Sequence, residues 1–213
     1  MDLNEELSQY VHEHSLEEED ILKELYRQTH ANIYHPRMVS GHLQGKILYM
    51  ICKMIQPKNV LEIGTFTGYS AISMAFALEN NSKITTIDNN DEIEDFTRQF
   101  IKKAKVEDKI DFKVGNALDI IPELKTEFDL VFIDGEKREY IDYYKLAIPK
   151  LKQGGFIIAD NVLWGGKVIE KKLRANDYDT HGIIEFNKFI KNDSKVENVM
   201  LPIRDGLMLI RKK

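Results

Sequence analysis

The sequence predicts an α/β fold: a doubly wound, mostly parallel seven-stranded sheet with a C-terminal antiparallel hairpin, preceded by N-terminal helices. Three observations predict it. From residue 59 onward, short β-branched or apolar runs alternate with amphipathic stretches, which is typical of parallel strands joined by crossover helices. Near the end, two strand-like runs flank a short Arg-Asp-Gly turn, which favours a hairpin. The first 55 residues instead show helical periodicity.

The N-terminal region should be helical. Its apolar residues recur at helical spacing in three stretches, at residues 3–11, 21–26 and 42–55. Ser15, with Glu18 three residues later, matches a capping box at the start of the second helix. Residues 32–41 contain a proline and a glycine and should form a loop.

Strands and helices then alternate along the chain. The predicted strands lie at 59–64, 83–88, 109–114, 128–134 and 155–160. The helices between them are expected at 68–80, 91–105, 116–125 and 138–152. A further helix near 181–192 precedes the two hairpin strands, which are expected at 195–203 and 207–212. Right-handed crossovers between the parallel strands give the doubly wound arrangement.

Length and composition bound the class of protein. The chain has 213 residues, which fits one domain, and we expect a single domain over 1–213 with a helical cap over 1–57 and a cofactor-binding α/β core over 58–213. The start is acidic and has no apolar signal segment, and no apolar run is long enough to cross a bilayer. We therefore expect a cytoplasmic protein with no membrane partner. A net charge of −5 argues against a surface that binds nucleic acid over most of its area. The single cysteine excludes an intrachain disulfide.

The turn after the first predicted strand suits a ligand. Gly64 permits a sharp turn and a close approach of the backbone to a bound molecule. The dinucleotide fingerprint G-x-G-x-x-G is absent, because Phe66 and Tyr69 stand at its second and third glycine positions. A bulky Phe66 leaves little room for a pyrophosphate, which disfavours NAD and FAD. The alternative is a purely structural role, in which Gly64 and Gly68 form a tight turn and a helix start.

An acidic residue ends the second predicted strand. Asp88 follows Gly64 by 24 residues, and an acid at this place can accept hydrogen bonds from both ribose hydroxyls of a nucleoside. A turn without room for pyrophosphate, together with such an acid, points to a nucleoside without a diphosphate, such as S-adenosylmethionine. Alternatively, Asp88 caps the helix that follows.

A second group of polar residues follows the fourth and fifth predicted strands. Asp134 ends one strand, and Asp160 and Asn161 end the next. If the two strands are neighbours, these side chains meet at one edge of the sheet and form an all-oxygen set suited to Mg²⁺, Ca²⁺ or Mn²⁺. Lys137, three residues after Asp134, could act as a general base toward a hydroxyl in this place. The alternatives are helix-capping acids and a solvated lysine.

At these residues the sequence resembles the cation-dependent class I O-methyltransferases, the group of catechol and caffeoyl-CoA O-methyltransferases and their small bacterial relatives. The match covers nearly the whole chain in order. Its segments are VLEIGTFTGYSAISMA (60–75), TTIDNN (85–90), GNALDIIP (115–122), DLVFIDGEK (129–137), GGFIIADNVLWGGKV (154–168) and LPIRDGLMLI (201–210).

The resemblance implies specific roles for these residues. It implies that S-adenosylmethionine is bound by Met38, Val39, Glu62, Gly64, Ser70, Asp88, Ala117 and Asp134, with Met38 and Val39 in a lid over the sulfonium. It implies a divalent cation, Mg²⁺ first and Mn²⁺ or Ca²⁺ as alternatives, held by Asp134, Asp160 and Asn161. Lys137 and Asp134 are the implied catalytic residues, and the resemblance favours a homodimer.

The methyl acceptor is less diagnostic. A catechol-like or other small hydroxylated molecule is our first expectation. The alternative is a hydroxylated wobble uridine of tRNA, because a basic strip that could hold phosphates follows the fifth strand; we define this strip as Lys167, Lys171, Lys172 and Arg174. A module that binds the cofactor without catalysis is a third possibility, which the combined metal and lysine positions disfavour.

Overall fold

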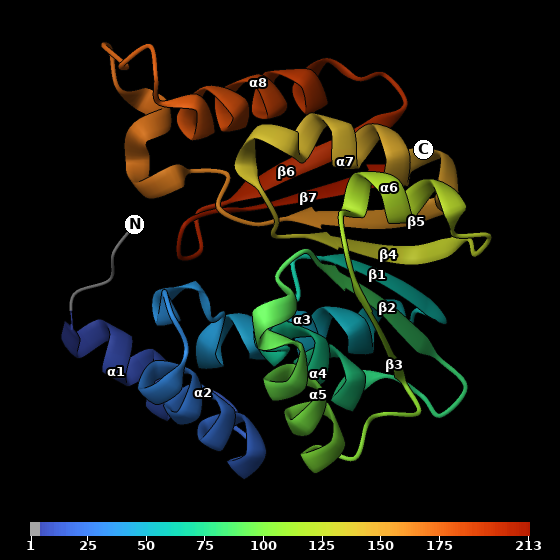
Figure 1. Ribbon diagram of the computed structural model, residues 1–213. Helices are drawn as coiled ribbons and strands as arrows, with labels where there is room; N and C mark the ends of the chain where they lie inside the picture. Colours follow the sequence, from blue (N-terminus) through green and yellow to red (C-terminus); the bar gives the residue numbers. More distant parts are fainter. Residues whose placement is uncertain (1–4) are drawn as a thin grey trace. The chain divides into compact units, whose positions relative to one another are not determined.

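The computed structural model describes residues 5–213, so that the start of the helix expected at 3–11 lies outside the described residues. These residues form two compact units (Figure 1). The first unit comprises Asn59–Gly64 and Asn116–Lys213, and the second comprises residues 5–58 and Thr65–Gly115. The division into a cap over 1–57 and a core over 58–213 stays a prediction.

The seven strands are hydrogen-bonded in the order β3-β2-β1-β4-β5-β7-β6, which confirms the predicted fold class. Their bounds are β1 Asn59–Ile63, β2 Lys83–Asp88, β3 Ile110–Val114, β4 Phe128–Ile133, β5 Leu151–Ala159, β6 Val196–Leu201 and β7 Leu207–Lys212. The pairs β1–β4, β4–β5 and β2–β3 are parallel. Strand β7 runs antiparallel to both β5 and β6, so the final hairpin inserts its last strand next to β5.

The first unit contains three helices and three 3₁₀ turns. They are α6 Ala117–Glu123, η3 Lys137–Glu139, α7 Tyr140–Ala147, η4 Ile148–Lys150, η5 Trp164–Ile169 and α8 Tyr178–Asn192. Helix α7 packs on β4, and both α6 and α8 contact α7. Strand β5 starts at Leu151, four residues before the predicted 155, and α7 ends at Ala147 rather than 152. Pro149 accounts for the end of α7, because it has no N–H for the next helical hydrogen bond, and the chain continues as the 3₁₀ turn η4.

The second unit holds the N-terminal helices and the crossover helices of β2 and β3. Its elements are α1 Glu5–Glu13, α2 Asp20–Asn32, η1 Pro36–Met38, α3 Gly41–Ile55, α4 Tyr69–Ala77, η2 Asp91–Ile93 and α5 Glu94–Lys103. Helix α4 contacts β2 and β3, while α3 packs on α4 and α2 packs on α4 and α5. Almost every residue of α4 is buried, which makes this helix the centre of the unit.

The predicted capping box at Ser15 is wrong. Helix α2 begins at Asp20, and its N-cap residue makes no side-chain cap bond. The Ser15 hydroxyl instead donates to the Val11 carbonyl, 2.6 Å away, at the end of α1. Sequence spacing alone cannot separate a serine that starts one helix from a serine that closes the preceding one.

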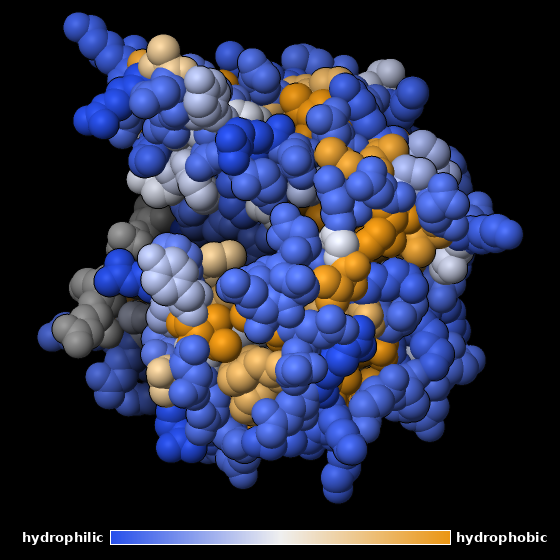
Figure 2. Space-filling model, in the orientation of Figure 1, coloured by the Kyte–Doolittle hydropathy of each residue, from blue (hydrophilic) through white to orange (hydrophobic). Residues whose placement is uncertain are grey.

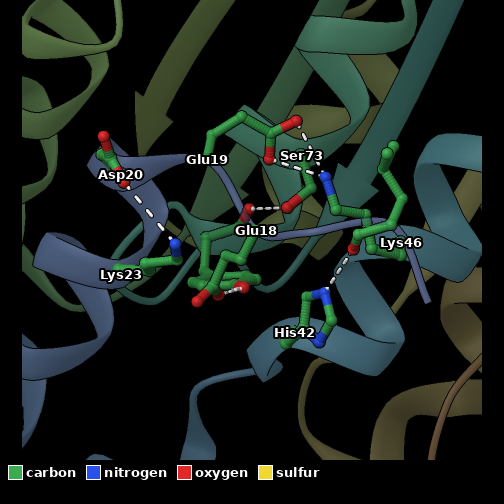
Figure 3. Close-up of polar contacts among 9 residues, drawn as sticks. Glu18, Glu19, Asp20, Lys23, His42, Lys46 and Ser73 are labelled. Atoms are coloured by element: carbon green, nitrogen blue, oxygen red, sulfur yellow. Dashed lines mark hydrogen bonds and ion pairs between the residues drawn. The ribbon is translucent and has the colours of Figure 1, made fainter. Parts of the chain in front are cut away.

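Tertiary contacts fix the link between α1 and α2 instead (Figure 3). Tyr69 donates a hydrogen bond to the Glu18 carboxylate, and the Lys46 ammonium donates to both carboxylate oxygens of Glu19 at 2.8 Å. His42 Nε2 lies 2.7 Å from the Leu16 carbonyl. The acidic residues of this link are therefore held by α3 and α4 of the same unit.

Figure 2 shows a face on which hydrophilic residues prevail and apolar residues occur in small groups. Among residues 5–213, every helix is too short or too polar to cross a membrane.

Candidate functional site

The ends of β4 and β5 bring two carboxylates together. In the parallel pairing of these strands, Ile133 lies opposite Ala159. The next residues are Asp134 and Asp160, and the Asp160 N–H donates to the Ile133 carbonyl at 2.9 Å. The register therefore places both aspartates at the same level of the carboxyl edge, as the sequence predicts for neighbouring strands. Asp160 is only 3% exposed.

Asn161 is the third residue of the predicted oxygen set. Its backbone has φ 55°, a left-handed conformation that asparagine tolerates better than most residues. Its backbone N–H donates to Asp160 Oδ1 at 2.7 Å, and this hydrogen bond orients the Asp160 carboxylate. Across the described part of the chain, no three His, Cys, Asp or Glu side chains come together as a metal-binding group.

Lys137 lies beside these acids, on the 3₁₀ turn η3. Its Nζ donates to Asp134 Oδ1 at 3.0 Å and to the Tyr140 hydroxyl at 2.8 Å. The same Nζ lies 5.8 Å from the centre of the Trp164 ring, a distance at which a cation is attracted to the ring face. The Lys137 side chain is 11% exposed, so it is not the solvated surface lysine of the alternative interpretation.

Tyr140 is a residue of this cluster that the sequence analysis does not single out. Its hydroxyl lies 3.1 Å from the Asp160 carbonyl, to which it donates. Burial, reinforced by the charges of Asp134 and Asp160, raises the pKa of Tyr140 well above its ordinary value, so the phenol keeps its proton. The spacing of three residues between Asp134, Lys137 and Tyr140 is the signal that could have found it.

Gly64 is required by the protein's own backbone. It has φ 99°, and a Cβ atom at this position would lie 2.2 Å from the carbonyl oxygen of Asp134. The turn after β1 and the turn after β4 thus pack directly against each other. Two residues earlier, Glu62 is fully buried on β1, opposite Phe132 of β4. A buried carboxylate needs polar partners, which distinguishes Glu62 from the apolar residues around it.

In the second unit, Asp88 is held in a defined orientation. Its Oδ2 accepts the Phe66 N–H at 2.6 Å, and its Oδ1 accepts the Asn90 N–H at 3.0 Å. Phe66 has φ 46°, an unusual conformation for a bulky residue. Asp88 is thus tied to the turn that follows Gly64, and its binding of a ribose stays a prediction.

Threonine hydroxyls hold this same turn, and the sequence analysis does not identify them. Thr65 Oγ1 lies 2.6 Å from Thr86 Oγ1 of β2. Thr97 Oγ1 of α5 donates to the Phe66 carbonyl at 2.9 Å, and Thr29 Oγ1 of α2 donates to Thr67 Oγ1 at 3.1 Å. The turn 65–67 is therefore attached to three separate elements of its unit.

The other predicted cofactor residues lie in various environments. Ser70 is buried in the first turn of α4. Ala117 is the buried first residue of α6, whose N-cap, Asn116, accepts the Leu118 N–H. In the predicted lid, Val39 is 5% exposed, whereas Met38 is 61% exposed. Only Met38 thus presents most of its side chain to solvent.

The basic strip is largely exposed. Lys171, Lys172 and Arg174 are exposed side chains in the segment that joins η5 to α8. Lys167 forms an ion pair with Asp177 at 3.6 Å. One of the four basic residues therefore has an acidic partner within the same segment.

Comparison with known proteins identifies the family. A sequence model described as O-methyltransferase matches residues 12–213. The caffeoyl-CoA O-methyltransferase of Eucalyptus gunnii is 38% identical over 217 residues, which cover 97% of this chain and 87% of the plant protein. The corresponding enzyme of Pinus taeda is also 38% identical, over 97% of this chain and 84% of its own.

Solved structures agree with the sequence comparison. The O-methyltransferase of Bacillus cereus in complex with SAH has a TM-score of 0.90 at 28% identity, covering 98% of this chain and 97% of that one. TomG of Streptomyces achromogenes, in complex with SAM, has a TM-score of 0.90 at 27% identity, covering 98% and 96%. The fold, the sequence motifs and the relatives all indicate the same family. The chain belongs to the O-methyltransferase family, and it is an S-adenosylmethionine-dependent O-methyltransferase.

Proposed function

We propose that the protein methylates one hydroxyl of a catechol-type acceptor and that it needs a divalent cation to do so. The observation that carries this proposal is the cluster at the ends of β4 and β5. Asp134 and Asp160 lie side by side in register, and the Lys137 ammonium lies 3.0 Å from Asp134. Such a group combines cation-binding oxygens with a nitrogen that can hold or move a proton.

The donor set fits a hard divalent cation. Asp134, Asp160 and Asn161 offer only oxygen atoms, which Mg²⁺ prefers as ligands. The Lys137 ammonium lies beside Asp134. These three residues would hold the ion. When bound, a divalent cation supplies positive charge that makes a neighbouring hydroxyl more acidic.

The residues of the chain supply the rest of the chemistry. Lys137 receives the proton of the acceptor hydroxyl, or as an ammonium stabilises the oxygen anion that attacks the methyl group. Asp134 and Tyr140 hold its Nζ in place through the two hydrogen bonds described above. The Trp164 ring borders the same Nζ and limits the access of water.

S-adenosylmethionine supplies an activated methyl group on a positively charged sulfur. In the second unit, we propose that Asp88 binds its ribose hydroxyls, because both carboxylate oxygens are already oriented by backbone N–H groups. The further residues proposed to contribute to cofactor binding are Met38, Val39, Ser70, Glu62, Gly64, Ala117 and Asp134.

The relatives suggest the class of acceptor. Curated relatives at 38% identity are caffeoyl-CoA O-methyltransferases, and a caffeoyl group carries two neighbouring hydroxyls on an aromatic ring. Two neighbouring hydroxyls can bind one cation together, which matches an all-oxygen site with three protein ligands. The exposed basic strip supports a tRNA acceptor less well, since Lys167 is paired with Asp177.

Methyl transfer from labelled S-adenosylmethionine tests the proposal directly. We expect transfer to caffeoyl-CoA or another catechol in Mg²⁺, its loss in EDTA, and its recovery when Mg²⁺ or Mn²⁺ is returned. Asp160→Ala should remove most activity because it deletes a charged ligand. Lys137→Ala should lower the transfer rate by about 10²- to 10⁴-fold, the range for a lost general base.

Asp129→Ala is the matched control, since Asp129 lies on the same strand as the Asp134 turn but at its opposite end, where it pairs with Lys152. It should leave transfer intact. Full activity in EDTA would refute the cation requirement. Transfer to undermodified tRNA, together with none to any catechol, would refute the acceptor class. The homodimer stays a prediction, which light scattering of the purified protein would check.

A further inference from the structure

Asp134, Lys137 and Tyr140 follow one another at intervals of three residues. The segment between the last two is the 3₁₀ turn η3, from Lys137 to Glu139, and α7 begins at Tyr140. In a 3₁₀ helix, residues three apart lie one above the other. This geometry explains why the Lys137 Nζ reaches the Tyr140 hydroxyl at 2.8 Å. The contact with Asp134 Oδ1 at 3.0 Å comes from the turn that follows β4, before η3 begins.

The Tyr140 hydroxyl uses its hydrogen-bonding capacity in two directions. It accepts from Lys137 and donates to the backbone carbonyl of Asp160 at 3.1 Å. Its ring is fully buried and packs edge-on against Phe186 of α8, with the ring centres 5.4 Å apart. The hydroxyl therefore has a fixed position, set by α8 on one side and by the end of β5 on the other.

A lysine nitrogen has three bonding directions besides its own carbon. Two of the three directions at Lys137 are taken by Asp134 and Tyr140. We propose that Tyr140 is a positioning residue that, together with Asp134, turns the third direction of Lys137 Nζ toward the acceptor hydroxyl. This role rests on the proposed function, because it gives Lys137 a defined orientation for the proton that the methyl transfer displaces. A 3.0 Å contact with Asp134 alone would leave the nitrogen free to rotate.

Tyr140→Phe tests the proposal, because it keeps the ring and removes only the hydroxyl. We expect kcat to fall about 10- to 100-fold, the effect of losing one hydrogen bond to a charged group, with the KM for S-adenosylmethionine unchanged. Tyr144→Phe is the matched control. Tyr144 is a buried tyrosine of the same helix α7, and its hydroxyl donates to Asp193 at 2.8 Å. It should change kcat by less than about twofold.

A double-mutant cycle separates positioning from a general structural effect. In the Lys137→Ala background, Tyr140→Phe should cause no further loss of kcat, because the group that it orients is already gone. If Tyr140 only stabilises the fold, the loss will be the same in both backgrounds, and the proposal is then wrong. Equal kcat values for Tyr140→Phe and Tyr144→Phe would also overturn it.

A chemical readout keeps this test independent of methyl transfer. We would label the folded protein with an acylating reagent and compare Lys137 with Lys145, which is exposed on α7, by peptide mass spectrometry. In the native chain Lys137 should react at least about tenfold more slowly than Lys145. Tyr140→Phe should remove much of that protection. Equal reactivity of Lys137 and Lys145 in the native chain would show that Lys137 is not held. Because no acceptor is involved, a protected Lys137 without catechol methylation would contradict the proposed function and leave the positioning by Tyr140 intact.

Discussion

Gly64→Ala should damage both the stability and the activity of the protein. The added Cβ would lie 2.2 Å from the Asp134 carbonyl oxygen, whereas real Cβ atoms essentially never come within 3.0 Å of another atom. The two turns must therefore separate by about 0.8 Å. They cannot do so easily, because the Asp134 N–H donates to the Ile63 carbonyl at 2.8 Å and β1 pairs with β4 up to this point.

Two free-energy contributions add up. An alanine at φ 99° is strained by about 1–3 kcal/mol. The collision adds about 1–3 kcal/mol, as for other overpacked sites. At about 2–4 °C per kcal/mol for a chain of this size, the collision alone should lower the unfolding temperature by roughly 2–12 °C. Displacing the Asp134 turn by a large fraction of an ångström should lower kcat/KM by about 10²-fold.

Gly154→Ala separates the collision from the backbone strain. Gly154 also has a positive φ, 76°, but the nearest atom to its added Cβ is a flexible arginine nitrogen at 3.5 Å. Thermal unfolding followed by circular dichroism, and methyl transfer by each variant, give the comparison. We expect Gly154→Ala to keep its activity. Equal unfolding temperatures for the two variants would refute the steric argument.

Three further predictions concern other residues. Asp88→Ala should weaken S-adenosylmethionine binding by about 1–3 kcal/mol, the cost of unpaired ribose hydroxyls; calorimetry on the folded variant checks this, and unchanged affinity would remove Asp88 from the cofactor site. Gly182→Ala would place a Cβ 2.7 Å from the Lys137 carbonyl, so kcat should fall about tenfold or more while cofactor affinity holds. Burial raises the pKa of four tyrosines above the ordinary 10.0. Their contribution to the free energy of unfolding is therefore full below about pH 10, and it is lost as the pH rises through their folded-state pKa values. Phenolate absorbance in an alkaline titration should therefore show delayed ionisation, whereas four ordinary titrations would contradict it; the tyrosines are Tyr69, Tyr140, Tyr143 and Tyr144.

Most of the fold can be predicted because its parallel strands are buried on both faces. Such strands read as short apolar runs between helices, and all five runs lie within or close to the observed β1 to β5. The errors fall at element ends, where tertiary contacts decide. Ser15 closes α1 rather than starting α2, because Glu18 bonds with Tyr69, which is distant in sequence.

The positions of the charged candidate residues are predictable for the same reason. Asp88 is the last residue of β2, and Asp134 and Asp160 directly follow β4 and β5. Acids at the carboxyl ends of parallel strands can be found from the strand pattern alone. The hydroxyl groups around them are not predictable in this way. Thr65 and Tyr140 have partners that only the folded chain brings close, and an isolated threonine or tyrosine in a sequence carries no sign of such a partner.

The threonine contacts around the turn 65–67 have a consequence for measurements in solution. Hydroxyl groups carry no charge, so dissolved ions do not screen hydrogen bonds between them, in contrast to exposed ion pairs. The pairs Thr65–Thr86 and Thr29–Thr67 should thus keep the same geometry from dilute buffer to concentrated salt. Of the contacts described for this turn, only the one with the Asp88 carboxylate is charged. An ionic-strength effect on turnover therefore reports on Asp88 or on charged groups elsewhere, such as the exposed lysines and arginine after η5.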